Sequence, residues 1–400
     1  MQRRAASPMI EVQATARHFL GMPAARFLRD YWQKKPLLVR QAFPEYVSPI
    51  EPEDLAGLAC EDLALARIVS HDRQRDAWTL RSGPFAEDEF PGMPDHDWTL
   101  LVQDVDKWDA DVRQVLQAFD FLPRWRIDDV MVSFAASGGS VGAHVDQYDV
   151  FLLQAQGRRH WQVDAGPNPP TDFRDDAELK LLRQFHPTHD WVLEPGDMLY
   201  LPPGVPHHGV AVDPCLTFSI GMRAPSSSEL IGDYLDYLTS DADETLRYQD
   251  PDLAPPSDPN LIDDAAMARA IAALNALRVD DPDRLGAWFG RFITTYRAAG
   301  EVVAPEQQRS RIELEWDLQQ GGRLLRHPFS RMAWRRRGKR ATLFCSGLEF
   351  ELSGADAARL AGAETLDGPT YSALGQDGCD AVFELHAQGH YQLEAAEEAP

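Results

Sequence analysis

Two histidines and one aspartate have the residue types and the spacing of a metal site. Val145 separates His144 from Asp146, and His207 follows Asp146 by 61 residues in the sequence Leu-Pro-Pro-Gly-Val-Pro-His-His-Gly. Two imidazoles and one carboxylate on one face of Fe(II) leave positions open for oxygen chemistry. In an extended segment residues i and i+2 point the same way, so His144 and Asp146 should converge. The second histidine must then come from a distant strand.

His208 competes with His207 for the role of second histidine ligand. Adjacent residues of a strand face opposite sides, so only one of the two can reach the metal. For a lone histidine in a strand, a core position with satisfied hydrogen bonds is the more common role. The order and context of all three residues favour metal binding here.

The segments around these residues read as short strands. They are rich in β-formers, alternate or run apolar, and are separated by turn residues such as those of 135–140 and 154–157, the second of which suggests a hairpin. Turn signals every eight to twelve residues predict an antiparallel barrel or jelly roll rather than a parallel sheet. The expected strands cover residues 129–134, 148–153, 158–163, 207–212 and 216–222, and residues 194–202 read as a Pro-Gly turn that leads into one further short apolar strand.

Four stretches of the chain resemble the JmjC-type ribosomal oxygenases, and most closely the bacterial ribosomal-protein arginine hydroxylases. The stretches are residues 126–134, 142–151, 157–161 and 201–207. The likeness begins near Phe27, is strong up to Pro225 and is weaker towards the C-terminus. It implies a double-stranded β-helix that binds Fe(II) and 2-oxoglutarate. In the family motif the ligand directly follows the proline, which favours His207 over His208.

The resemblance also implies roles around the triad. 2-Oxoglutarate would chelate two metal positions, O2 would take the last, and decarboxylation to succinate would produce the oxidant that takes hydrogen from a C–H bond. Arg159 lies on the next strand, and a guanidinium can grip the distal carboxylate of the cosubstrate. Ser133 would donate a hydroxyl to the same molecule. Thr217 stands where an asparagine is expected from the closest relatives, so this contact departs from the pattern.

A substrate arginine would need an acid for its guanidinium and flat walls for its methylene groups. Asp129 and Met131 share a strand face with Ser133 by alternation, which makes them the candidate acid and a candidate wall. Core packing is the alternative for Met131. Tyr148 follows Asp146 by two residues and should point into the same cavity, and Ser219 would supply another polar contact. These substrate roles rest more on the resemblance than on spacing.

Three regions make the chain an α+β protein with a JmjC/cupin jelly roll. The resemblance implies that residues 1–225 form a JmjC catalytic domain with a mixed N-terminal segment, 226–304 a helical dimerisation region, and 305–400 a winged-helix-like domain. The last region should contain a hairpin over 342–352, a helix over 355–363 and a final hairpin over 382–393.

Two apolar stripes recur at helical spacing in the middle region. Such stripes are usually intramolecular core, but the resemblance predicts that the wider one is buried in a homodimer. The narrower stripe is Met267, Ile271 and Leu274, and the wider stripe is Leu285, Trp288, Phe289, Phe292, Ile293 and Tyr296.

Charge and composition narrow the choice of partner and location. A formal net charge of −24 repels phosphate backbones and suits a basic protein partner, so no direct nucleic-acid binding is expected. Between Arg323 and Arg340 there are eight Lys/Arg and no acid, and a solvated basic face is favoured over an RNA contact. Four cysteines without metal or disulfide spacing, and no long apolar run or signal peptide, predict a cytoplasmic protein without a membrane span.

These features predict a 2-oxoglutarate-dependent dioxygenase that hydroxylates an arginine side chain of a large-subunit ribosomal protein. A JmjC hydroxylase of a histidine or lysine in another protein would have the same triad, and only the substrate pocket discriminates the two. A non-oxidative cupin enzyme with Zn or Mn would not need Arg159. A non-catalytic cupin-fold binding or scaffold protein is a further alternative, against which the intact triad argues.

Overall fold

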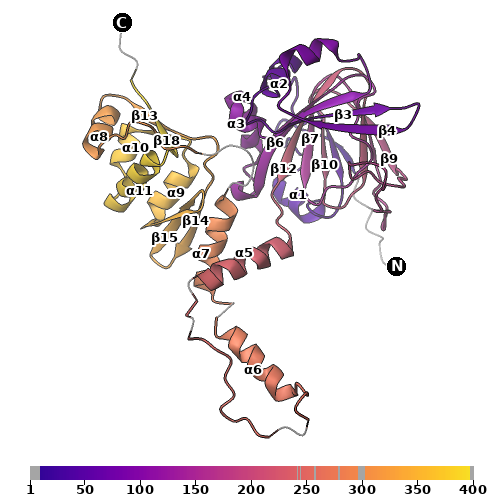
Figure 1. Cartoon of the computed structure of the whole chain (residues 1–400). Helices are drawn as coiled ribbons and strands as arrows, with labels where there is room; N and C mark the ends of the chain where they lie inside the picture. The colour runs from indigo at the N-terminus through magenta and orange to yellow at the C-terminus, as the bar shows by residue number, and fades with distance from the viewer. Residues whose placement is uncertain are drawn as a thin grey trace, which may run out of the picture. The chain divides into compact units, whose positions relative to one another are not determined.

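A computed structural model describes residues 10–240, 242–243, 245–255, 258–277, 280–295 and 302–396. The chain divides into two compact units, of which the first ends at Ala224 and the second begins at Pro225. Each unit has hydrophobic clusters of its own. Figure 1 colours the helices and strands of both along the chain.

The first unit is rich in strands. Its helix α1 (Ala24–Asp30) starts directly after Pro23. Before the metal-binding loop the other elements are β1 (Glu11–Gln13), β2 (Leu37–Arg40), α2 (Pro52–Leu58), β3 (Ala66–Asp72), β4 (Ala77–Ser82), η1 (Glu87–Gly92), β5 (Trp98–Val102), α3 (Val105–Trp108), α4 (Ala110–Gln114), η2 (Val115–Phe119), η3 (Arg124–Arg126) and β6 (Ile127–Ala135). After it come β7 (Val150–Gln156), β8 (Arg159–Val163), β9 (His189–Leu193), β10 (Met198–Leu201), β11 (His207–Ala211) and β12 (Cys215–Met222).

These strands form the two sheets of a jelly roll, as predicted. The larger sheet has the order β1-β2-β10-β7-β12-β6-β5-β3-β4, and the smaller has the order β11-β8-β9. Leu152 of β7 and Leu199 of β10 pack in one cluster with Trp161 of β8, so the two sheets share a core. Phe151, on the opposite face of β7, packs into a different hydrophobic cluster of the same unit. Because both faces of β7 are buried, its first four residues, Val150 to Leu153, are all apolar instead of alternating.

The turn at Gly157 differs from the hairpin that the sequence suggests. Strand β7 pairs with β10 and β12, whereas β8 pairs with β9 and β11, so the chain crosses from one sheet to the other at this turn. Gly157 has φ 63°, and a Cβ there would lie 2.2 Å from the carbonyl oxygen of Pro214. The prediction of a turn is confirmed only at Gly157, because residues 154–156 still belong to β7. Strand pairing depends on segments far away in the sequence.

The second unit begins with three helices, α5 (Ser227–Ser240), α6 (Asp264–Asn275) and α7 (Pro282–Thr294). Trp288 and Phe292 of α7 are 6% and 4% exposed and pack with Tyr234 and Leu238 of α5. The prediction that the α7 stripe is buried in a homodimer is therefore wrong for these residues, because α5 of the same chain already covers them. Tyr296, the last residue of the predicted stripe, lies outside the described residues.

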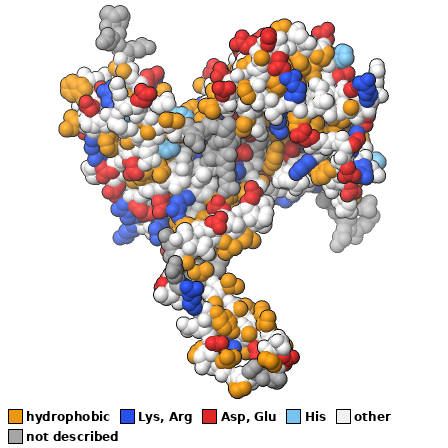
Figure 2. All heavy atoms as spheres, viewed as in Figure 1, with side chains coloured by type: hydrophobic (Ala, Val, Ile, Leu, Met, Phe, Trp, Pro, Cys, Tyr) orange, Lys and Arg blue, Asp and Glu red, His pale blue; other side chains and the backbone are white. Residues whose placement is uncertain are grey.

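Helix α6 differs from α7 because its apolar side chains are exposed. None of its residues is buried, and Met267, Ile271 and Leu274 are 52%, 55% and 65% exposed. Figure 2 shows hydrophobic side chains gathered over this helix. Because its three residues are exposed, the narrower stripe is an open apolar face of the single chain. Within the described ranges, no helix is both long and apolar enough to pass through a bilayer.

The C-terminal part combines two small sheets, β17-β13-β18 and β14-β15-β16, with four helices among the described residues. The predicted hairpin is confirmed, with its turn at Ser346 and Gly347. The predicted helix over 355–363 is confirmed as α9. The elements are α8 (Arg311–Gln319), β13 (Arg323–Arg326), β14 (Met332–Arg337), β15 (Arg340–Cys345), β16 (Leu348–Ser353), α9 (Gly354–Gly362), β17 (Thr365–Asp367), α10 (Gly368–Ser372), α11 (Gln376–Ala387) and β18 (Tyr391–Glu394).

The predicted final hairpin over 382–393 is wrong. Residues up to Ala387 belong to helix α11, and only β18 is a strand. Gly378, Ala381, Val382 and Leu385 follow the spacing i, i+3, i+4, i+7 and are all buried, which is the pattern of one helix face. Residues 382–393 begin in the middle of α11, so they contain only part of this pattern.

The basic run from Arg323 to Arg340 is partly neutralised inside its own unit. Arg335 lies 3.6 Å from Asp283, and Arg340 lies 2.8 Å from Asp377. Arg323, Arg326 and Arg337 also pair with acids. These pairs agree with a structural basic face, and the absence of nucleic-acid binding stays a prediction.

Candidate active site

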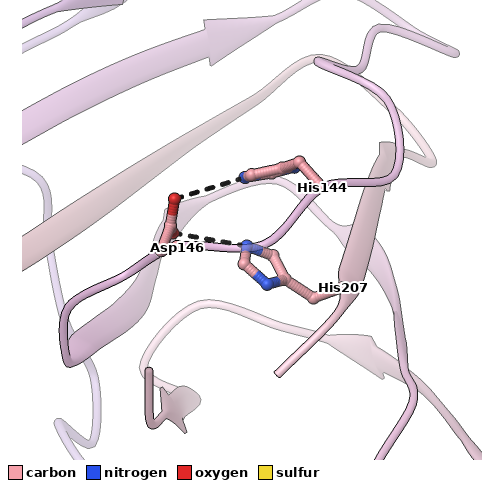
Figure 3. Close-up of side chains that lie close together, drawn as sticks. All are labelled: His144, Asp146 and His207. Atoms are coloured by element: carbon pink, nitrogen blue, oxygen red, sulfur yellow. Dashed lines mark ion pairs between the residues drawn. The ribbon is translucent and has the colours of Figure 1, made fainter. Parts of the chain in front are cut away.

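The three predicted metal ligands lie together at one end of the smaller sheet. His144 Nε2 is 3.9 Å from Asp146 Oδ1, and His207 Nε2 is 3.6 Å from Asp146 Oδ2. Figure 3 shows the three side chains converging. Divalent first-row metals take nitrogen and oxygen ligands at about 2 Å, so two ligands of one ion lie no more than about 4 Å apart. Both distances meet this condition.

Two backbone hydrogen bonds hold His144 and His207 directly opposite each other. His207 is the first residue of β11, whereas His144 and Asp146 lie in the loop between β6 and β7 and not in a regular strand. The amide of His144 donates to the carbonyl of His207 at 3.1 Å, and the amide of His207 donates back at 3.0 Å. This isolated bridge supplies the local extension that the sequence pattern implied.

The Nδ1 atom of each of these two histidines already has a hydrogen-bond partner. His144 Nδ1 donates to the carbonyl of Gly142 at 3.0 Å, and His207 Nδ1 donates to that of Val205 at 2.9 Å. Because a carbonyl can only accept, both hydrogens sit on Nδ1 and both Nε2 atoms are free to bind a metal. Burial, reinforced by the neighbouring His144, lowers the pKa of His207 to about 4, which keeps this ring neutral.

His208 faces away from this centre. Its Nε2 lies 3.1 Å from the hydroxyl of Ser140, which accepts the amide of Gly142. Among the residues that the structure describes, the only group of three or more potential ligands close enough to share a metal is His144, Asp146 and His207. The geometry thus agrees with the choice of His207 over His208.

A buried arginine occupies another part of the same pocket. Arg159 of β8 is 3% exposed, and its Nη1 donates to Ser133 Oγ at 3.2 Å and to Thr217 Oγ1 at 3.4 Å. No acid of the described chain pairs with it, its Nε has no hydrogen-bond partner, and burial lowers its pKa. A buried charge without a counter-ion is costly, so this site fits a carboxylate ligand.

An acid occupies a further part of the pocket. Burial, together with the nearby carboxylates of Asp104 and Asp106, raises the pKa of Asp129 to about 7. The backbone amide of Asp104 donates to Asp129 Oδ2 at 3.1 Å. Lys107 pairs with Asp104 and Asp106. A single lysine therefore lies near three carboxylates, those of Asp104, Asp106 and Asp129. This excess of negative charge fits a cationic ligand.

Known proteins similar to this chain account for most of its length. Residues 114–230 match the JmjC domain, and residues 276–392 match the ROXA-like winged helix. Over 307 residues the chain is 36% identical to the ribosomal protein uL16 3-hydroxylase of Escherichia coli (strain K12), which spans 75% of this chain and 79% of that protein. The chain belongs to the JmjC ribosomal oxygenases.

Further relatives agree with this family. A probable ribosomal oxygenase of Haemophilus influenzae is 41% identical over 228 residues, or 57% of this chain and 54% of that protein. The X-ray structure of E. coli YcfD is similar with a TM-score of 0.85 at 32% identity, over 94% of this chain and 99% of that chain. A YcfD complex with cobalt and 2-oxoglutarate has a TM-score of 0.80 over the same shares of both chains, at 32% identity.

The winged-helix match of this ribosomal oxygenase includes α7. It begins at residue 276, whereas the sequence placed the start of the last domain at 305. Packing gives the reason, because a Cβ on Gly290 of α7 would lie 2.3 Å from the ring of Phe344 in β15. Helix α7 therefore packs directly on the sheet of the C-terminal part.

All ten predicted site residues of the oxygenase line one pocket. Sequence reasoning missed Trp161 and Gly221, although alternation from Arg159 and Ser219 would have found both. Asp128 is exposed and also lines this pocket. The ten are Asp129, Met131, Ser133, His144, Asp146, Tyr148, Arg159, His207, Thr217 and Ser219.

Proposed function

We propose that this ribosomal oxygenase hydroxylates an arginine side chain of a large-subunit ribosomal protein with Fe(II), 2-oxoglutarate and O2. One observation carries the proposal: a metal triad, a buried arginine without a counter-ion and a half-buried acid with a raised pKa line the same pocket. The likeness to a uL16 3-hydroxylase supports a ribosomal substrate.

The metal triad and Arg159 would have different roles toward the cosubstrate. His144, Asp146 and His207 would hold Fe(II), which together with 2-oxoglutarate and O2 supplies an oxidant for unactivated C–H bonds. Arg159 would bind the distal carboxylate of 2-oxoglutarate, with the hydroxyls of Ser133 and Thr217 beside its guanidinium. Thr217 Oγ1 also donates to Gln154 Oε1 at 3.2 Å, which orients the hydroxyl.

The remaining pocket residues fit an arginine side chain. Asp129 would pair with the substrate guanidinium, and its high pKa would fall once that cation is bound. Tyr148, which is 42% exposed, would form a wall near solvent, and Met131 would contact the methylene groups. Ser219 is paired with Met131 across β12 and β6 and would add a polar contact.

The charge and the surface suggest the partners. A protein of net charge −24 would attract a basic ribosomal protein, and we expect it to meet this substrate in the cytoplasm without binding nucleic acid directly. The exposed apolar face of α6 supports a homodimer, because such faces on monomers usually mark interaction sites.

Intact-mass analysis of ribosomal proteins tests the proposal. Ribosomal proteins are incubated with the enzyme, Fe(II) and 2-oxoglutarate, and one protein should gain a single oxygen that fragmentation places on an arginine. Omitting 2-oxoglutarate is the control. Oxygen on a histidine or lysine would keep the enzyme class and overturn the substrate, and 2-oxoglutarate turnover without any modified protein would overturn the ribosomal target.

A further inference from the structure

Strand β11 carries two small residues opposite the largest side chains of β8. Gly209 and Ala211 follow His207 at two and four residues, so they share its sheet face. In the register of the pair, Gly209 lies opposite Trp161 and Ala211 lies opposite Arg159. The indole and the guanidinium side chain are thus each paired with a residue that has little or no side chain.

The space above Gly209 is already filled. A Cβ at this position would lie 2.7 Å from both Cη2 and Cζ3 of Trp161 and 2.9 Å from Nε of Arg159. Gly209 is not among the glycines with positive φ, so its backbone conformation does not require glycine. Steric room is therefore the reason for glycine here, as is typical of glycines inside strands where other groups approach closely.

The indole supports the arginine. Cζ of Arg159 lies 5.0 Å from the centroid of the Trp161 ring, a cation–π geometry, and Trp161 is 4% exposed. The same ring lies 5.9 Å from that of His207. Trp161 thus lies beside a metal ligand and beside the arginine, and any shift of the indole would move the guanidinium.

We propose that Gly209 is a positioning residue for 2-oxoglutarate: its missing side chain lets Trp161 lie against Arg159 and sets where the guanidinium meets the cosubstrate. The inference rests on the role proposed above for Arg159. Gly209 acts through these two side chains, so its substitution should weaken 2-oxoglutarate binding and spare the metal site.

The test uses the full-length protein loaded with Co²⁺, which allows binding without turnover. In Gly209→Ala the affinity for 2-oxoglutarate, measured by calorimetry, should fall roughly tenfold or more, while the Co²⁺ affinity and its visible absorption stay as in the wild type. Gly57→Ala is the matched control, because nothing lies within 4 Å of a Cβ at that position. It should change neither affinity.

A second substitution separates positioning from general damage. Trp161→Phe removes Cη2 and Cζ3, the indole atoms nearest to the new methyl group. The double variant Gly209→Ala/Trp161→Phe should therefore bind 2-oxoglutarate about as well as Trp161→Phe alone, a coupling that a double-mutant cycle measures. If Gly209→Ala does not fold, this comparison decides, and a double variant that also fails to fold overturns the inference.

Arg159→Ala tests the proposed role of Arg159 separately from that of Gly209. It should weaken 2-oxoglutarate binding by roughly 30-fold or more, because it removes a buried charged partner. If it does so while Gly209→Ala binds like the wild type, or loses Co²⁺ and 2-oxoglutarate affinity in parallel, the role of Gly209 is refuted and that of Arg159 stands. An unchanged affinity in Arg159→Ala would refute the proposed role of Arg159 itself.

Discussion

At the residue scale, each histidine of the triad is oriented by the hydrogen bond of its second ring nitrogen. His144→Ala, Asp146→Ala and His207→Ala should each abolish the formation of succinate from 2-oxoglutarate, because two ligands hold the metal poorly. His208→Ala should keep most of the turnover, since this ring faces Ser140. Loss of turnover in His208→Ala with retention in His207→Ala would reverse the ligand assignment.

The raised pKa of Asp129 predicts a pH dependence of substrate binding. With a pKa of about 7 the carboxyl is neutral at lower pH and charged at higher pH, so the affinity for an arginine peptide should rise with pH. Below the pKa the loss approaches roughly tenfold per pH unit. Titrating peptide into the Co²⁺-loaded protein between about pH 6 and about pH 8 measures it.

Asp129→Asn is the control for this profile. It should bind the peptide weakly at every pH and leave slow, uncoupled 2-oxoglutarate decay in place, because it alters the partner of the guanidinium and not that of the metal. A variant that retains the wild-type pH profile would assign the dependence to another group.

At the scale of elements, α5 and α7 form one packed pair. Trp288 contributes its ring to their shared core, and its Nε1 donates to Asp233 Oδ1 at 2.8 Å. Trp288→Ala should lower the free energy of unfolding by about 3–5 kcal/mol, as measured by urea denaturation. Leu285→Ala, on the same helix at 39% exposure, should cost clearly less. Equal losses would mean that the pair is not the stabilising contact.

For the whole molecule, the exposed face of α6 predicts self-association. Ile271→Glu places a charge in the expected interface and should yield folded monomers in light scattering and circular dichroism, because the 55% exposed side chain is not needed by the single chain. Ile312→Glu on α8, at 79% exposure, is the matched control and should remain dimeric. A wild-type chain that is monomeric at micromolar concentration would refute the homodimer.

The amino-acid sequence by itself determined the features that depend on near neighbours. The convergence of His144 and Asp146, the shared face of Asp129 and Ser133 and the turn at Ser346 follow from local rules of strand alternation and turn chemistry. The choice of His207 and most of the other site residues came from the resemblance of short sequence stretches to a known family. Together these collected the ten predicted residues that line one pocket.

Features that depend on distant segments became visible only in the folded chain. The structure shows that α5 covers Trp288, that β7 and β8 belong to different sheets, and that burial and the nearby acids raise the pKa of Asp129. The space that Trp161 and Arg159 take above Gly209 is likewise set by strand pairing. Burial, pairing and charge proximity arise between residues far apart in the chain, so local patterns carry no record of them.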